Sequence, residues 1–189
     1  MTETLILLFH PEPARSRANA ALARAAAALP GVEVVEMQPL YPTGAIDVAA
    51  EVARLLRARR VVLQFPVQWY AAPPLLRQWQ DAVLTRMFYL APETEGRRLQ
   101  GTPMLVAATA GNVPEAYGSG GINLFPLEEL LRPLQATASR CGLPWSAPFL
   151  LHGASRLDGA GLAAAGQRYA ARLRQWQAEM PRGAVSWAG

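Results

Sequence analysis

Five short apolar runs alternate along the chain with longer stretches of helical periodicity, and this alternation constrains the fold more than any other feature. The apolar runs are residues 5–9, 32–37, 61–65, 103–109 and 146–151. Strands that are apolar throughout are typical of parallel sheets covered on both faces. A strand–helix repeat of about 38 residues therefore predicts an α/β fold with helices on both faces of a parallel sheet.

The stretches between the apolar runs carry helix start and stop signals. The predicted helices span residues 16–29, 46–59, a segment that opens at Pro74, 126–141 and 157–180. Proline suits the first turn of a helix, and glycine commonly follows the last turn. We predict one domain over residues 1–180, followed by a loose C-terminal tail at residues 181–189.

Composition excludes several classes of protein. The net charge is +4, but all eighteen basic residues are arginines scattered along the chain, so nucleic-acid binding is not favoured. The single cysteine, Cys141, cannot form an internal disulfide and fits a reducing compartment. No apolar run approaches the roughly 18 residues of a membrane span, and no basic segment opens a secretion signal. We expect a cytoplasmic protein without a metal site.

The loop after the first predicted strand, residues 10–19, is a candidate phosphate site. Ligands of doubly wound sheets bind beyond the carboxyl ends of the strands. The loop lacks the G-x-G-x-x-G fingerprint, and the chain has no lysine for a P-loop. Free N–H groups at the helix start suit a phosphate monoester, and Ser16 could cap the helix. Further donors could come from His10, Arg15 or Arg17, Ser16 and Asn19. The alternative is a capped helix with a solvated loop.

The loops after the third and fourth predicted strands could hold a planar ring. Trp69 and Tyr70 lie between prolines and form a stiff apolar ledge, or alternatively they cover the core. Residues 109–123 are rich in glycine, whose backbone can approach a ligand closely, although a surface turn would look the same. Together the three loops offer a phosphate site, an apolar aromatic surface and a cluster of backbone amides. This combination matches flavin mononucleotide (FMN), which has a phosphate tail and a planar isoalloxazine with one polar edge.

Several motifs resemble the NAD(P)H:quinone oxidoreductases of flavodoxin-like fold. The run at residues 64–81 is similar to the signature of that family, as are His10, Ser16 and Asn19 in their spacing. Further segments resemble the ancillary quinone oxidoreductase of the glutathione-regulated potassium-efflux system, namely residues 40–42, 46–51, 133–138, 141–145, and Pro148 with His152. The resemblance extends from residue 4 to about residue 178.

The resemblance implies a sheet of strand order 2-1-3-4-5 and a homodimer with flavin sites at the subunit interface. It assigns the flavin phosphate to His10, Ser16, Arg17, Ala18 and Asn19. It assigns the isoalloxazine to Val67, Gln68, Trp69 and Tyr70, and the N1/O2 side of the ring to Thr109, Ala110, Gly111 and Asn112. The segment at residues 87–90 differs from the family pattern, and we expect its aromatic residues Phe88 and Tyr89 to contribute across the dimer.

The chain departs from the family pattern in the loop after the fourth predicted strand, beside the predicted flavin ring. The family usually has a second glycine where this chain has Asn112. In the mammalian quinone reductases a tyrosine and a histidine follow this loop. Tyr117 stands at the place of the tyrosine, and Asn123 stands at the place of the histidine. Tyr117 and Asn123 are therefore the predicted catalytic residues, and Asn123 cannot change charge.

These patterns indicate a flavoenzyme that passes a hydride from NAD(P)H through FMN to a quinone by ping-pong exchange. The alternative is a regulatory subunit that docks on the cytosolic domain of a potassium-efflux transporter, at the inner face of the membrane, with secondary reductase activity. A one-electron flavodoxin carrier is not favoured, since such carriers are strongly acidic.

Five other residues are predicted to be structural. We expect Cys141 and His152 to be packing residues, Glu51 and Asp81 to form contacts on helix surfaces, and Asp158 to begin the last helix.

Overall fold

The computed structural model describes residues 2–179, which are organised around a five-stranded sheet. The strands are β1 (Thr4–Leu8), β2 (Val32–Glu36), β3 (Val61–Pro66), β4 (Met104–Thr109) and β5 (Phe149–Leu151). Every strand pair is parallel, and the spatial order is β2-β1-β3-β4-β5. This arrangement confirms the predicted α/β class and the flavodoxin-like strand order 2-1-3-4-5.

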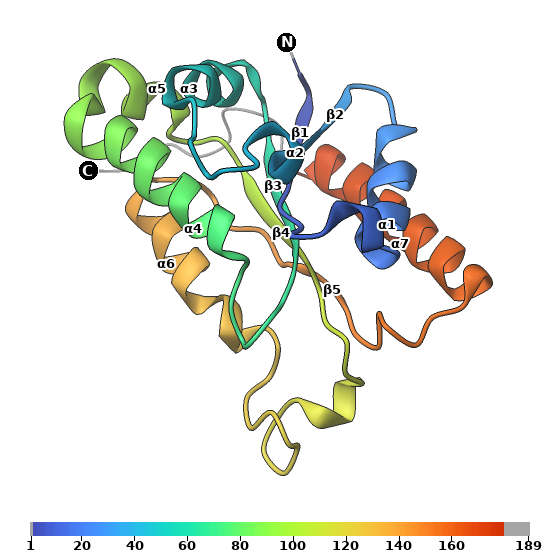
Figure 1. Cartoon of the computed structure of the whole chain (residues 1–189). Coiled ribbons are helices and arrows are strands. Elements are labelled where there is room, and N and C mark those ends of the chain that lie inside the picture. The colour runs from blue at the N-terminus through green and yellow to red at the C-terminus, as the bar shows by residue number, and fades with distance from the viewer. Residues whose placement is uncertain (1, 180–189) are drawn as a thin grey trace.

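Helices cover both faces of the sheet (Figure 1). One face carries α1 (Ala18–Ala27) and α7 (Gly159–Glu179), and the other carries α3 (Val48–Arg57), α4 (Pro74–Trp79), α5 (Arg97–Leu99) and α6 (Arg132–Arg140). A short helix, α2 (Met37–Leu40), follows β2. Three π-helical turns continue α4, namely η2 (Gln80–Leu84), η3 (Arg86–Leu90) and η4 (Pro92–Gly96). Single 3-10 turns are η1 (Pro13–Arg15), η5 (Pro114–Ala116) and η6 (Glu129–Leu131).

Two hydrophobic cores lie on opposite sides of the sheet. Successive residues of a strand point to opposite faces. Leu5 and Leu7 of β1 accordingly pack in the core beneath α3, α4 and α6, while Ile6 packs in the core beneath α1 and α7. All five residues of β1 are buried, as expected for an inner strand of a covered sheet.

The helix α7 packs against α1 and β1 at the beginning of the chain. Gly166 of α7 lies so close to α1 that a Cβ there would come within 3.0 Å of the Ala25 Cβ. The Gln177 amide donates to the Thr4 hydroxyl at 2.9 Å, and the fully buried Trp176 indole donates to the Ser146 hydroxyl at 2.6 Å. Residues far apart in the sequence therefore close the core on this face of the sheet.

Two predicted elements begin later than expected because of proline. The strand predicted at residues 146–151 is regular only from Phe149, since Pro148 has no N–H to donate to the ladder. The helix predicted at residues 126–141 becomes α-helical only at Arg132, which leaves Pro133 in the first turn, where proline is tolerated. At the start of α7, the Asp158 carboxylate accepts from the Gly161 N–H at 2.8 Å, so Asp158 begins that helix as predicted.

The expectation that Glu51 lies on a helix surface is wrong. Its side chain is fully buried and accepts from the Tyr41 hydroxyl at 2.8 Å, the Trp79 indole at 3.0 Å and the Arg54 guanidinium at 3.1 Å. Asp81, by contrast, does form a surface ion pair, 2.9 Å from Arg77 one turn away. The segments around residues 40–42 and 46–51 thus meet in a buried polar cluster, whose role is structural.

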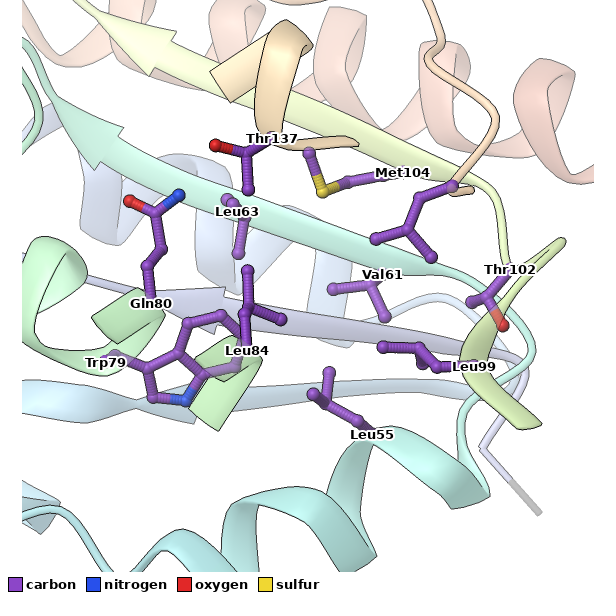
Figure 2. Close-up of a pocket in the computed structure, with 11 residues that line it drawn as sticks. Leu55, Val61, Leu63, Trp79, Gln80, Leu84, Leu99, Thr102, Met104 and Thr137 are labelled. Atoms are coloured by element: carbon purple, nitrogen blue, oxygen red, sulfur yellow. The ribbon is translucent and has the colours of Figure 1, made fainter. Parts of the chain in front are cut away.

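The core beneath α3 contains a small hollow of about 20 Å³. Figure 2 shows that most of its lining side chains, among them Leu55, Leu63 and Met104, are apolar, while Gln80, Thr102 and Thr137 are polar. It lies near Val61 and Met104, where β3 and β4 begin, at the opposite end of these strands from the three loops of interest. An apolar space of this size stays dry, and we interpret it as a packing defect.

Cys141 is buried, and burial raises the pKa of its thiol to about 11. The thiol is therefore neutral at physiological pH, which fits the predicted packing role. Within residues 2–179 no helix is both long and apolar enough to cross a membrane. The predicted loose tail, residues 181–189, lies outside the described residues.

Candidate functional site

Hydrogen bonds between neighbouring strands join the three candidate loops. The Val67 N–H at the end of β3 donates to the Thr109 carbonyl at 2.8 Å. The Asn19 amide of α1 donates to the Thr109 hydroxyl at 2.9 Å, and the Gln64 amide of β3 donates to the Asn19 carbonyl at 2.9 Å. Since Asn19, Gln64 and Thr109 are all buried, these bonds fix the start of α1 against β3 and β4.

The start of α1 presents open backbone donors. The Ser16 hydroxyl oxygen accepts from the Ala20 N–H at 3.2 Å, so Ser16 caps this end from one position outside the helix. No acceptor among the described residues takes the N–H groups of Arg17, Ala18 or Asn19. Open N–H groups at a helix start, together with the helix dipole, favour an anion.

His10 adds a donor beside these amides. Its Nδ1 accepts from the Glu12 N–H at 3.1 Å, so the neutral ring carries its proton on Nε2. Burial lowers the pKa of His10, an effect that the Glu12 carboxylate opposes. The neutral imidazole is thus oriented by its own loop, with an N–H left to donate.

Two predicted phosphate donors are already engaged. The Arg17 guanidinium donates to the Leu157 carbonyl at 3.1 Å, and the Arg15 guanidinium lies 2.8 Å from Glu12. The Asn19 side chain is buried against Thr109, which leaves only its backbone N–H facing outward. The arginines and the Asn19 amide therefore position the loop in this structure.

Trp69 and Tyr70 form the tip of a tight hairpin turn. Gln68 and Ala71 pair on either side of it, each N–H donating to the other's carbonyl at 3.0 Å. Trp69 has φ 47° and Tyr70 has φ 63°, the left-handed values that a type I′ turn requires at both central positions. Asparagine and glycine usually occupy such positions, because other side chains are strained there. Strain of this kind is concentrated at functional sites.

Replacing Trp69 with glycine should stabilise the fold. The Trp69 side chain is 93% exposed, so its removal sacrifices little packing, while glycine adopts positive φ freely. We expect the free energy of unfolding to rise by about 1 kcal/mol in Trp69→Gly, measured by urea denaturation. Trp69→Ala is the matched control, because it removes the ring but keeps the strain. Equal stabilities of the two variants would contradict the interpretation.

A large open hollow of about 410 Å³ lies beside this turn. It is bordered by Tyr70 and by residues of α4 and α6, and most of its lining side chains are apolar. The Tyr70 hydroxyl also donates to the side-chain amide oxygen (Oδ1) of Asn123 at 3.3 Å. Asn123 therefore connects the aromatic turn to the glycine-rich loop.

Part of the predicted amide cluster after β4 is used within the fold. The Ala110 N–H donates to the Leu151 carbonyl at 2.8 Å, whereas the N–H groups of Gly111 and Asn112 have no acceptor among the described residues. Asn112 does not adopt positive φ, and its side-chain oxygen accepts from the Val113 N–H at 3.0 Å. A Cβ added to Gly111 would meet nothing closer than the Ser155 hydroxyl at 3.5 Å. Packing does not require glycine there, since a Cβ would make only an ordinary van der Waals contact with Ser155.

The Tyr117 ring packs edge-to-face against the His152 ring, with the centroids 5.4 Å apart. Burial raises the pKa of Tyr117 and lowers the pKa of His152. The two residues lie on different loops, after β4 and β5, and no sequence pattern predicts their contact. The buried Gln64 side chain, by contrast, could have been identified as a site residue from the sequence, since Gln64 is the one polar residue within the apolar run at residues 61–65.

No group of three or more His, Cys, Asp or Glu side chains within residues 2–179 is arranged to hold a metal ion. The polar groups that remain open are N–H groups and one imidazole, and these suit an anion.

Comparison with known proteins agrees with this arrangement. The flavodoxin-like fold family model matches residues 2–175. The glutathione-regulated potassium-efflux system ancillary protein KefF of Klebsiella pneumoniae (strain 342) is 42% identical over 173 residues, which cover 92% of this chain and 96% of that protein.

Two solved structures are similar as well. General stress protein 14 of Treponema denticola, in complex with FMN, has a TM-score of 0.80 and 30% identity, covering 95% of this chain and 99% of that one. An NADPH-quinone reductase of P. pentosaceus has a TM-score of 0.77 and 28% identity, covering 97% and 99%. The chain belongs to the flavodoxin-like fold family, and its curated relatives there include the ancillary proteins of the glutathione-regulated potassium-efflux system.

Proposed function

We propose that the protein is an FMN-dependent NAD(P)H:quinone oxidoreductase. The observation that carries this proposal is the set of open N–H groups at the start of α1, beside His10 and at the same sheet edge as the aromatic turn. A similar protein was solved with FMN, and another is named an NADPH-quinone reductase.

The described residues fit FMN in two respects. Within residues 2–179, five donors have no acceptor, as a terminal phosphate requires: the N–H groups of Arg17, Ala18 and Asn19, the Ser16 hydroxyl and the His10 Nε2–H. Gly111 is exposed, and the N–H groups of Gly111 and Asn112 have no acceptor among the described residues, so a ligand can reach them.

The remaining assigned residues surround the ring in this proposal. Val67, Gln68, Trp69 and Tyr70 flank one edge of the isoalloxazine, and Thr109, Ala110, Gly111 and Asn112 face its N1/O2 side. FMN, when bound, supplies the chemistry of accepting a hydride from NAD(P)H and passing it to a quinone in alternate half-reactions. The open amides stabilise negative charge on that side, because fixed donors need no reorganisation as charge forms.

Release and identification of the bound cofactor test the proposal. Mass spectrometry of the supernatant after denaturation should show FMN, and the purified protein should oxidise NAD(P)H when a quinone is added. FAD at full occupancy, or the absence of flavin binding and of quinone reduction, would contradict the proposal.

Tyr117→Phe should slow reduction of the bound flavin by roughly 10-fold, if the hydroxyl donates to the charge that forms, since tenfold corresponds to about 1.4 kcal/mol. Stopped-flow absorbance measures the rate.

Asn123→His should make the rate of flavin reduction depend on pH between about pH 6 and 7.5, because histidine titrates there and asparagine does not. If neither variant differs from wild type, neither side chain acts on the flavin.

We also propose a homodimer, with an interface along the groove between α4 and α6. A second hollow of about 430 Å³ shares Arg77, Gln80 and Thr137 with the one beside Tyr70. The exposed side chains of Tyr89 and Leu90 follow on η3. Phe88 is buried, so Tyr89 is the aromatic residue available to a partner.

Light scattering should give about 41 kDa, twice the 20.4 kDa of one chain. Leu90→Asp should shift the mass toward one chain, because a carboxylate would be buried in the interface. Leu40→Asp on α2 is the matched control, since Leu40 is also exposed but lies away from the groove. A monomeric, fully active wild-type protein would contradict this proposal.

A second candidate role follows from the identity with the potassium-efflux ancillary protein. The chain would dock on the cytosolic domain of a potassium-efflux transporter, at the inner face of the membrane. Co-purification with that domain tests it, and a protein that reduces quinones but never binds the domain would have the enzymatic role alone.

A further inference from the structure

The sequence contains only two histidines, His10 and His152, and the second has no function in the proposal above. His152 directly follows β5, and the neighbouring Gly153 N–H donates to the Asn112 carbonyl at 2.7 Å. This bond holds the turn after β5 against the loop after β4. His152 is therefore anchored beside the predicted flavin site by backbone contacts.

The contact between His152 and Tyr117 is close and specific in geometry. The ring centroids lie 5.4 Å apart with an interplanar angle of 67°. Aromatic pairs prefer this edge-to-face arrangement, and it lets the charge of one ring act on the other. Both side chains are half-buried, so water screens that interaction less than at the surface.

The titratable groups around the pair act in defined directions. Burial lowers the pKa of His152, and the Glu115 carboxylate on η5 opposes this by favouring the imidazolium. Burial raises the pKa of Tyr117, and Tyr70 adds to this effect. Tyr70 in turn donates to Asn123. Tyr70 of the aromatic turn therefore interacts with the loop after β4 through Tyr117 and Asn123, and Tyr117 contacts His152 in the turn after β5.

We propose that His152 is the titratable partner of Tyr117, and that it binds a proton when negative charge enters the site. The inference deepens the proposed function, on which its redox consequence rests. A hydride taken from NAD(P)H leaves NAD(P)⁺ and carries one negative charge into the site. One solvent proton bound by the imidazole offsets that charge. His152 acts through Tyr117 and is thus a positioning residue.

The first test follows the two imidazoles by NMR as the pH is varied, on the purified protein without added flavin. We expect His152 to titrate below pH 6.5. Glu115→Gln should lower its midpoint further, because it removes a carboxylate that favours the cation. Tyr117→Ala should raise the midpoint toward 6.5, because the imidazole becomes hydrated. The midpoint of His10 is the internal control and should stay unchanged in both variants.

Glu115 is exposed, so Glu115→Gln should fold normally and keep the test decisive even if Tyr117→Ala does not. A His152 midpoint that is the same in wild type and Glu115→Gln would overturn the proposal. This result is independent of whether the protein reduces quinones, so it separates a failure of the inference from a failure of the proposed function.

The second test adds FMN and measures its reduction potential against pH. Between about pH 5 and 7 the potential of the wild type should fall more steeply with rising pH than that of His152→Gln, which cannot take up the extra proton. Arg57→Gln, a change at the exposed last residue of α3 just before β3 begins, lies at the opposite sheet edge and should behave as the wild type. Equal slopes for wild type and His152→Gln would overturn the proposal.

Discussion

Glu51→Ala should lower the free energy of unfolding by about 3–5 kcal/mol. The carboxylate is fully buried and accepts from Tyr41, Trp79 and Arg54. Alanine would leave these donors without an acceptor inside the core, where an unmet hydrogen bond is costly. Thermal unfolding followed by circular dichroism should show a fall in Tm of roughly 10 °C.

Two further variants make the result specific. Glu51→Gln keeps the shape but loses the charge and one acceptor atom, so we expect an intermediate loss. Asp81→Asn removes a surface ion pair with Arg77 and should cost less than about 1 kcal/mol. If Glu51→Ala were no worse than Asp81→Asn, the buried cluster would not be stabilising the fold.

Asn19→Ala should weaken both the fold and the binding of FMN. Its amide is the buried link between the start of α1 and Thr109 at the end of β4. Loss of a buried hydrogen bond costs about 1–3 kcal/mol. A freer helix start would also place its open N–H groups less accurately, and we expect the dissociation constant for FMN to rise about 10-fold or more, measured by flavin fluorescence.

Thr109→Val separates this bond from other effects, because it removes the hydroxyl with almost no change in shape. A double-mutant cycle of Asn19→Ala and Thr109→Val should be non-additive, since both variants remove the same interaction. Additive losses of affinity would show that Asn19 acts on the flavin by another route.

The sequence predicted the sheet well because each strand is a continuous apolar run with a recognisable end. Its strand order was implied by family resemblance, and the structure agrees. The starts of β5 and α6 were misplaced because Pro148 and Pro133 break the hydrogen-bond pattern at positions that hydrophobicity alone does not mark.

Contacts between distant segments could not be predicted. Glu51 was expected at the surface because the apolar periodicity of α3 does not reveal which other elements pack on that helix. The residues that cover the Glu51 carboxylate are Trp79 of α4 and Tyr41 in the turn after α2. The pairing of Tyr117 with His152 joins two loops separated by a whole helix. The same applies to Asn19, whose spacing suggested a phosphate ligand, while its amide group lies in the protein interior against Thr109.

The packing of α7 against α1 and β1 has a consequence for synthesis on the ribosome. The side chains that complete the core on that face, Tyr169, Leu173 and Trp176, are among the last residues of the described chain to be translated. Until they emerge, Leu22 of α1 and Ile6 of β1 lack the cover that α7 supplies. The nascent chain therefore carries apolar surface on this face until α7 is made, and chaperones bind surfaces of that kind.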